Sequence, residues 1–350
     1  MLQKTLISLM IFCYGLIHSQ SAIKMRGIIS AKDTSIDTIN FNCGLVNKYY
    51  YETNTLSAKI INNEFSLDFK LSYPHLYALI LNSEKKKGVS INDFVFLDST
   101  TTEIKLGPNS KLETSNGISN NEYLKTFTAY MLKNKKENLN FYFFNNHELD
   151  LNLLGYIEKY PDSYVALWYL IQKISISGYF GLYEKSLNSF SKKIKSEKLW
   201  KTVFQEFNNI KIKENNKFPE LDLINFNLCK EKLIVPKSEY TLIDYWFSRC
   251  KPCLEQLPSL IEIYNKNKNK GFNVIGISVD ETENIVSFWQ KIIIEKKLPW
   301  KNYLDENGII ATQEKIMSFP SNFLLNNKGE IIKKNISLEE LEYFLQQKLD

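Results

Sequence analysis

The chain has 350 residues, of which 44% are hydrophobic and 24% charged, and at about 150 residues per domain this length predicts roughly two domains. That composition excludes a small disulfide-stapled scaffold and a disordered tail. The net charge of +5 is too small to indicate nucleic-acid binding, and five cysteines are too few for a disulfide-dense protein.

The N-terminal segment has the layout of a secretory signal peptide. A basic start with Lys4 precedes a mainly apolar run over residues 5–17, and small or polar residues follow. The run is shorter than the roughly 20 residues of a membrane-spanning helix, although an uncleaved anchor stays open as an alternative. Bulky Phe12 before Cys13 argues against a lipoprotein anchor. We therefore predict that residues 1–21 direct export to the periplasm or cell envelope, where disulfides are stable.

Residues 22–118 read as a β-rich domain of short strands. Two alternating runs within residues 58–69 flank an Asn-Asn pair, which is typical of a hairpin. Strand-like pieces continue to about residue 115, so we predict a small β-sandwich-like domain. We find no catalytic constellation in it.

Residues 119–215 change to helical periodicity and are predicted to form a helical spacer. Segments 122–127, 165–170 and 187–194 carry apolar residues at helical spacing. The many lysines are intermixed with glutamates, which favours solvated helix faces over a basic binding patch.

Residues 216–350 alternate between strand and helix patterns. Apolar strands are predicted at 240–247 and 272–279, and a hairpin at 322–332. A helix after Cys253 ends near Gly271, a plausible left-handed C′ residue. Asp280 to Glu283 and Ser337 to Glu340 each match a capping box that opens a helix. The order β-α-β-α-(short helix)-β-β-α has a Cys-x-x-Cys motif after its first strand.

Cys250 and Cys253 lie where this first strand turns into a helix. A thiolate is the nucleophile in disulfide exchange, and the pKa of a free cysteine near 8.5 must be lowered to produce it. The positive end of the helix dipole, with Arg249 and Lys251 nearby, suits that task. We therefore predict that Cys250 attacks and that Cys253, inside the first turn, resolves the mixed disulfide. Pro252 is tolerated because early helical N–H groups need no partner.

Half of a zinc site would also contain Cys-x-x-Cys, but tetrahedral zinc needs four ligands. Cys229 is the one other cysteine nearby in the sequence, and the three histidines, His18, His75 and His147, are remote. We predict no metal and no cofactor.

Asp244 is a charged residue within the apolar strand that precedes Cys250. Burial raises the pKa of a carboxyl group, which suits an acid–base that moves the proton of Cys253. The alternative is an aspartate at a solvated strand end.

The segment 245–258 resembles the active-site segment of thioredoxin-fold thiol–disulfide oxidoreductases, especially the exported TlpA/ResA-like group. Segment 319–325 is the second resemblance, and its Pro320 matches the cis-proline that faces the Cys-x-x-Cys motif. This likeness implies that the backbone of Phe319 is presented to an incoming peptide. It also implies a substrate-binding surface made by Trp246, Arg249, Lys251, Pro252 and Phe319.

The resemblance covers residues 218–350 and implies a thioredoxin fold with a redox-active Cys250–Cys253 disulfide. The part before it resembles the β module and helical spacer of Bacteroidota proteins, most clearly at residues 160–167. Two departures concern Arg249, where the family usually has Trp, and Asp244, where this group more often has Asn.

The family likeness implies reduction of protein disulfides, in cytochrome c maturation for many members, with protein disulfide or dithiol substrates and a membrane-bound electron donor. The residues themselves leave the redox direction open. Two other functions are weighed: a thiol peroxidase, whose Pro-x-x-x-Thr/Ser-x-x-Cys pattern is absent, and a binding module in which the cysteines are incidental. Pairing of Cys43 with Cys229 also stays open.

Overall fold

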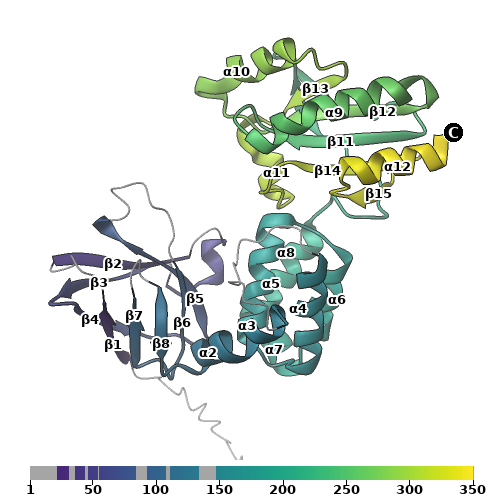
Figure 1. Cartoon of the computed structure of the whole chain (residues 1–350). Helices are drawn as coiled ribbons and strands as arrows, with labels where there is room; N and C mark the ends of the chain where they lie inside the picture. Colours follow the sequence, from purple (N-terminus) through teal and green to yellow (C-terminus); the bar gives the residue numbers. More distant parts are fainter. Residues whose placement is uncertain are drawn as a thin grey trace, which may run out of the picture.

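A computed structural model describes residues 22–30, 36–43, 46–53, 55–83, 93–107, 111–133 and 147–349. The predicted signal peptide, residues 1–21, lies outside the described residues. A β module, a helical spacer and a C-terminal α/β domain follow one another along the chain (Figure 1). This arrangement confirms the predicted fold class. None of the helices in the described ranges is long and apolar enough to cross a bilayer.

The described residues of the β module form eight strands in the order β6-β5-β2-β3-β4-β1-β7-β8. They are β1 (Ile23–Ile29), β2 (Ile36–Asn42), β3 (Thr55–Ile61), β4 (Glu64–Phe69), β5 (His75–Leu81), β6 (Asp93–Leu97), β7 (Glu103–Leu106) and β8 (Leu112–Ser115). A short helix, η1 (Lys48–Tyr50), precedes β3.

The predicted hairpin is confirmed as β3 and β4. Asn62 and Asn63 form its turn with φ values of 51° and 64°. Asparagine tolerates this left-handed region, and two such residues give the turn that matches the twist of paired strands. Ile61 and Glu64 pair directly beside the turn.

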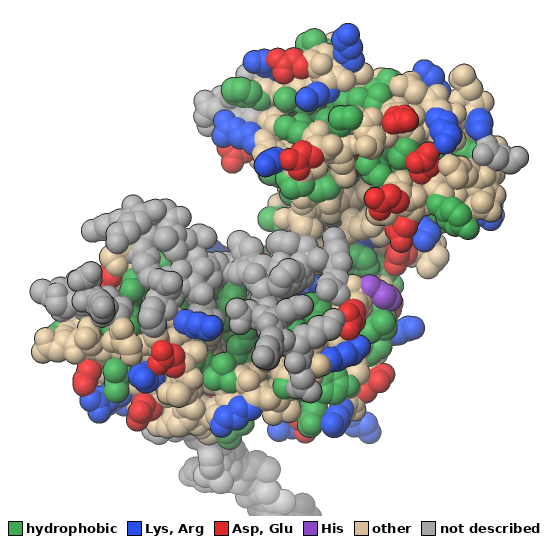
Figure 2. All heavy atoms as spheres, viewed as in Figure 1, with side chains coloured by type: hydrophobic (Ala, Val, Ile, Leu, Met, Phe, Trp, Pro, Cys, Tyr) green, Lys and Arg blue, Asp and Glu red, His purple; other side chains and the backbone are tan. Residues whose placement is uncertain are grey.

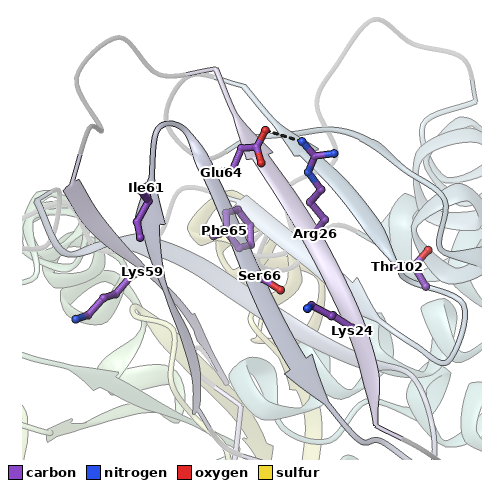
Figure 3. A pocket seen from close by; sticks show the side chains of 8 residues that line it. All are labelled: Lys24, Arg26, Lys59, Ile61, Glu64, Phe65, Ser66 and Thr102. Carbon is purple, nitrogen blue, oxygen red and sulfur yellow. Dashed lines mark hydrogen bonds and ion pairs between the residues drawn. The ribbon is translucent and has the colours of Figure 1, made fainter.

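The outer face of this sheet is polar because exposed and buried positions alternate along β1, β3 and β4. A shallow groove of about 740 Å³ lies on that face (Figure 3). Its lining includes Lys24, Lys59 and Arg26, and the guanidinium of Arg26 pairs with Glu64 at 2.5 Å. Both partners are largely exposed, so the pair contributes little stability.

The helical spacer contains α2 (Ile118–Asn121), the π-helical turn η3 (Glu122–Phe127), α3 (Thr128–Met131), α4 (His147–Lys159), α5 (Tyr164–Ser177), α6 (Gly181–Ser189), α7 (Lys192–Ser196) and α8 (Lys198–Asn209). Helix α5 is buried along nearly its whole length. Helices α4, α6 and α8 and the turn η3 pack against it.

Segment 187–194, whose apolar residues have helical spacing, is divided between two helices. The helix stops at Phe190, whose backbone is extended, and Ser191 begins a new one. Its hydroxyl accepts a hydrogen bond from the backbone of Ile194 at 3.3 Å. Serine is a preferred N-cap residue, so a new helix begins at Ser191 although the apolar residues keep helical spacing across the break.

The β module and the spacer share one continuous hydrophobic core. Trp168 of α5 is fully buried and its indole donates a hydrogen bond to the carbonyl of Pro74 at 2.7 Å. The rings of Trp168 and Tyr51 lie 4.8 Å apart between centroids. The sheet and the helices therefore stabilise each other.

The C-terminal domain is built on a sheet whose described strands follow the order β10-β9-β13-β12-β11-β14-β15. The strands are β9 (Asp222–Asn225), β10 (Lys230–Lys232), β11 (Tyr240–Trp246), β12 (Phe272–Ser278), β13 (Lys301–Leu304), β14 (Ser321–Asn326) and β15 (Ile331–Lys334). The central strands β11, β12 and β13 are parallel, and β14 runs antiparallel to β11.

Helices cover both faces of this sheet. Helix α9 (Lys251–Asn267) and helix α12 (Leu338–Leu349) pack on one face, and α11 (Ile309–Gln313) packs on the other. Helix α10 (Thr282–Glu295) follows β12, and the short turns η4 (Lys268–Lys270) and η5 (Glu306–Gly308) complete the domain. Figure 2 shows basic and acidic side chains interspersed on the visible face of this domain.

The cap predictions have different outcomes. Ser337 and Glu340 form the predicted reciprocal capping box at α12, with N···O distances of 3.1 and 3.2 Å. Gly271 has the predicted left-handed backbone, with φ of 101°. The capping box at Asp280 is wrong, because Glu281 is the N-cap of α10 and the Asp280 carboxylate binds elsewhere.

Cys43 and Cys229 are free thiols. Cys43 is partly buried, and burial raises its pKa. Cys229 lies exposed between β9 and β10, and the pairing of Cys43 with Cys229 that the sequence left open is not formed.

Replacing Trp168 with alanine tests the shared core. We expect Trp168→Ala to lower the free energy of unfolding by about 3–5 kcal/mol, because it creates a cavity and leaves the Pro74 carbonyl without its donor. The exposed Tyr49→Ala serves as control, with a change within about 0.5 kcal/mol. Denaturant titration measures both, and equal effects would contradict a common core.

Candidate active site

Cys250 is the N-cap residue of α9. Its backbone is extended, and its Sγ accepts a hydrogen bond from the backbone of Cys253 at 3.2 Å. A sulfur atom thus occupies the position where helices commonly have a serine or aspartate oxygen. Pro252 lies in the first turn, where its missing N–H costs nothing.

Cys250 and Cys253 form a disulfide, with their Cα atoms 5.2 Å apart. Both are buried, together with Trp246, Trp289 and Leu304. The sulfur atoms therefore lie against an apolar cluster on one side and the helix N-terminus on the other.

The Phe319–Pro320 peptide bond is cis, as predicted from Pro320. The ring of Phe319 meets the ring of Phe247 edge-to-face, with 5.5 Å between centroids. Because Phe247 precedes the cysteines by three positions and Phe319 packs against the disulfide cluster, the two segments named in the sequence analysis form one site.

Asp244 is buried in the middle of the sheet, between Gly276 of β12 and Asn322 of β14. This placement excludes the alternative of a solvated strand end. Burial raises the pKa of its carboxyl group to about 7. The group can therefore take up and release a proton near neutral pH.

The residues predicted to bind substrate differ in exposure. Arg249, Lys251 and Pro252 are exposed beside the disulfide, and Phe319 is partly exposed. Trp246 is buried beneath the disulfide, a position that suits support of the cysteines rather than contact with a substrate.

The charges beside the cysteines have partners. The Arg249 guanidinium lies over the ring of Phe288, 5.7 Å from its centroid. The Lys251 ammonium is 3.7 Å from the carboxylate of Glu255 one turn later. Phe288 belongs to α10 and is 45% exposed, so α10 extends the surface around the disulfide.

Asp280 and Ser248 are site residues that the sequence analysis missed. The buried Asp280 carboxylate accepts hydrogen bonds from the Ser248 backbone at 3.0 Å and the Ser248 hydroxyl at 2.7 Å. It also accepts one from Ser278 at 2.5 Å. These bonds fix the turn that carries Cys250.

A sequence signal for this contact exists. Ser248 follows β11 and Asp280 follows β12, and parallel neighbouring strands end at the same edge of a sheet. Trp289 was also missed, because in the sequence it is one more apolar residue of a helix. Across the described ranges, no three His, Cys, Asp or Glu side chains come together as metal ligands.

Residues 238–331 match a family model described as thioredoxin-like. The chain is 30% identical over 114 residues to the thiol-disulfide oxidoreductase ResA of Bacillus cereus, which covers 32% of this chain and 64% of that protein. It is 29% identical over 107 residues to the sporulation thiol-disulfide oxidoreductase A of Bacillus subtilis, a match that covers 30% of this chain and 65% of that protein. The chain thus spans just under two thirds of the length of these curated relatives.

Solved structures also resemble the chain. One is the thioredoxin domain of a thiol-disulfide oxidoreductase from Bacteroides vulgatus, at 27% identity and a TM-score of 0.35, covering 39% of this chain and 98% of that one. Another is a thiol-disulfide oxidoreductase from Bacteroides fragilis, at 28% identity and a TM-score of 0.34, covering 38% and 98%.

The titration of Asp244 gives a pH-dependent prediction. The carboxyl has a pKa of about 3.9 in the unfolded chain and about 7 in the folded one. Between these values the unfolded chain has lost the proton that the folded protein keeps, so this group lowers stability as pH rises, by up to about 4 kcal/mol.

Asp244→Asn removes this titration. We expect the unfolding free energy of the oxidised variant minus that of the wild type to increase from pH 4 to pH 8. Denaturant titrations across this range measure the difference, and a constant difference would contradict a carboxyl group that stays protonated near neutral pH.

Proposed function

We propose that the protein is a thiol–disulfide oxidoreductase of the TlpA/ResA type that reduces protein disulfides, a proposal supported by the thioredoxin-like match of residues 238–331 and the similarity to ResA. The observation that carries this proposal is the Cys250–Cys253 disulfide at the N-terminus of α9, packed against the loop with the cis-proline.

Reduction begins with the dithiol form. The Cys250 thiolate attacks one sulfur of the substrate disulfide, forms a mixed disulfide and releases the other substrate sulfur as a thiolate. Cys253 then loses its proton and attacks the Cys250 sulfur, which releases the second substrate thiol. The two electrons of the dithiol pass to the substrate, and the Cys250–Cys253 disulfide remains.

Each neighbouring group has a task in this sequence. The helix N-terminus stabilises the negative charge on Cys250. Asp244, whose pKa lies near neutral, takes the proton from Cys253. The backbone of Phe319 pairs with the substrate peptide, and Arg249, Lys251 and Pro252 form the exposed rim that the substrate meets.

The N-terminal sequence supports a setting for this reaction outside the cytoplasm. The signal-like pattern of residues 1–21 supports export to the periplasm or cell envelope. Outside the cytoplasm the oxidised enzyme needs a source of electrons, and we infer a membrane-bound donor. Maturation of cytochrome c, which requires reduced cysteines, is the process we propose for it.

Cysteine variants test the proposed roles. We expect Cys250→Ser to abolish reduction of insulin disulfides, because the attacking thiolate is lost. We expect Cys253→Ser to accumulate a mixed disulfide with the substrate, because no thiol resolves it. Cys229→Ser, which changes an exposed free cysteine, should keep full activity. Insulin reduction that persists in Cys250→Ser would refute the proposal.

The reduction potential tests the direction. Dithiols of this fold range from about −270 to about −120 mV. A reductase is expected toward the negative end, below about −180 mV. Equilibration of the Cys250–Cys253 pair with glutathione buffers measures it, and a value near the upper limit would identify an oxidant instead.

A further inference from the structure

The helical spacer contacts the C-terminal domain directly before the cis-proline loop. The backbone N–H of Met317 donates a hydrogen bond to the carbonyl of Ile176, in the last turn of α5, at 2.9 Å. Gly178 follows with φ of 66°, and a Cβ atom there would lie 2.8 Å from the carbonyl oxygen of Glu314. The end of α5 thus packs against the backbone that leads to Phe319.

Two further contacts fasten the same region. The buried carboxylate of Glu314 accepts hydrogen bonds from the backbone N–H groups of Lys211 and Ile212, at 2.7 and 2.9 Å, just after α8. The Lys334 ammonium, in β15, donates to the carbonyls of Ser177 and Tyr179 and lies over the ring of Phe180, 4.2 Å from its centroid. Both contacts join the end of a spacer helix to the C-terminal domain.

Glu206 of α8 links all three parts of the chain through one oxygen atom. Its Oε2 lies 3.1 Å from the ammonium of Lys315 and accepts a hydrogen bond from the hydroxyl of Tyr50 at 2.6 Å. The side chains of Glu206 and Lys315 are only 21% and 18% exposed, so solvent screens the pair less than a surface pair. Burial and the bond to Glu206 raise the pKa of Tyr50 well above its usual range, so the phenol stays a donor.

We propose that the helical spacer positions the cis-proline loop for substrate binding, and that Glu206 is a positioning residue of this reaction. Lys315 and Met317, which the spacer holds, precede Phe319 by four and two residues. A loop fixed before the substrate arrives loses less conformational freedom on binding. The inference rests on the proposed function, because it assigns the spacer a part in the same site.

Glu206→Ala tests the proposal. We expect KM for insulin disulfides to increase about fivefold while kcat changes less than about twofold, because the loop binds the peptide but does no chemistry. Reaction with glutathione disulfide, which offers little peptide to the loop, and the reduction potential of the cysteine pair should stay at wild-type values. Lys315→Met removes the ion pair from the other side and should reproduce the result if Glu206→Ala loses stability.

The control is Glu220→Ala, which breaks the exposed pair with Lys232 in the C-terminal domain and should change none of these quantities. An equal loss with insulin and with glutathione disulfide, or unchanged kinetics with insulin, would overturn the proposal.

Hydrogen exchange separates this inference from the proposed function. Backbone amides of residues 316–323 should exchange faster in Glu206→Ala than in the wild type, whatever the protein's activity. If the wild type fails to reduce insulin, the proposed function falls while this measurement still decides whether the spacer fixes the loop. Unchanged exchange would refute the positioning role.

Discussion

The first turn of α9 has backbone N–H groups that need an acceptor, and the chain supplies a sulfur atom there. The Cys250 sulfur receives the N–H of Cys253, while the N–H of Cys250 itself bonds to the carbonyl of Phe247 at 3.0 Å. Strand β11 ends at Trp246, and residues 247–250 form a turn that this last hydrogen bond closes. In the proposed reaction the sulfur that caps the helix is also the nucleophile, so a change in this turn would alter the chemistry as well as the helix.

Two buried aspartates near this turn differ in how burial is compensated. The Asp280 carboxylate accepts hydrogen bonds from Ser248 and Ser278, which offset the cost of removing a carboxylate from water. For Asp244, burial is the one cause of the change in pKa, which rises to about 7. The first environment suits a side chain that holds the backbone by hydrogen bonds, and the second suits a group that exchanges protons.

Structural features could be predicted from the sequence where the interactions that cause them are between residues close together in the chain. The turn at Asn62 and Asn63 and the cap at Ser337 each depend on residues within a few positions, and cysteine spacing at a strand–helix junction indicates the chemistry. The cap at Asp280 was wrong because Ser248, which is 32 residues away in sequence, competes for the same carboxylate. No local pattern reports such a partner.

The contact of Tyr50 with Glu206 shows the same limit more strongly, since 156 residues separate them. The predicted helical spacer includes the residues of α8 but leaves Glu206 as one of many polar residues in it. Its partners become visible only when the shared core brings the β module against the spacer. Residues that support a site from a distance therefore escape a sequence analysis that finds the reacting atoms.

Lys315 receives support both from its own domain and from the spacer. Its φ of 58° lies in the left-handed region, which costs a residue with a Cβ about 1–2 kcal/mol. Within the domain, the N–H of Ile316 bonds to the carbonyl of Ala311 at 2.7 Å, and the Ser321 hydroxyl bonds to the carbonyl of Ser318 at 2.7 Å. These bonds hold the two ends of the segment. The N–H of Lys315 itself bonds to the carbonyl of Thr312 at 3.2 Å. Its ammonium pairs with Glu206, so a side chain of the spacer adds to the backbone bonds that lead into Phe319 and Pro320.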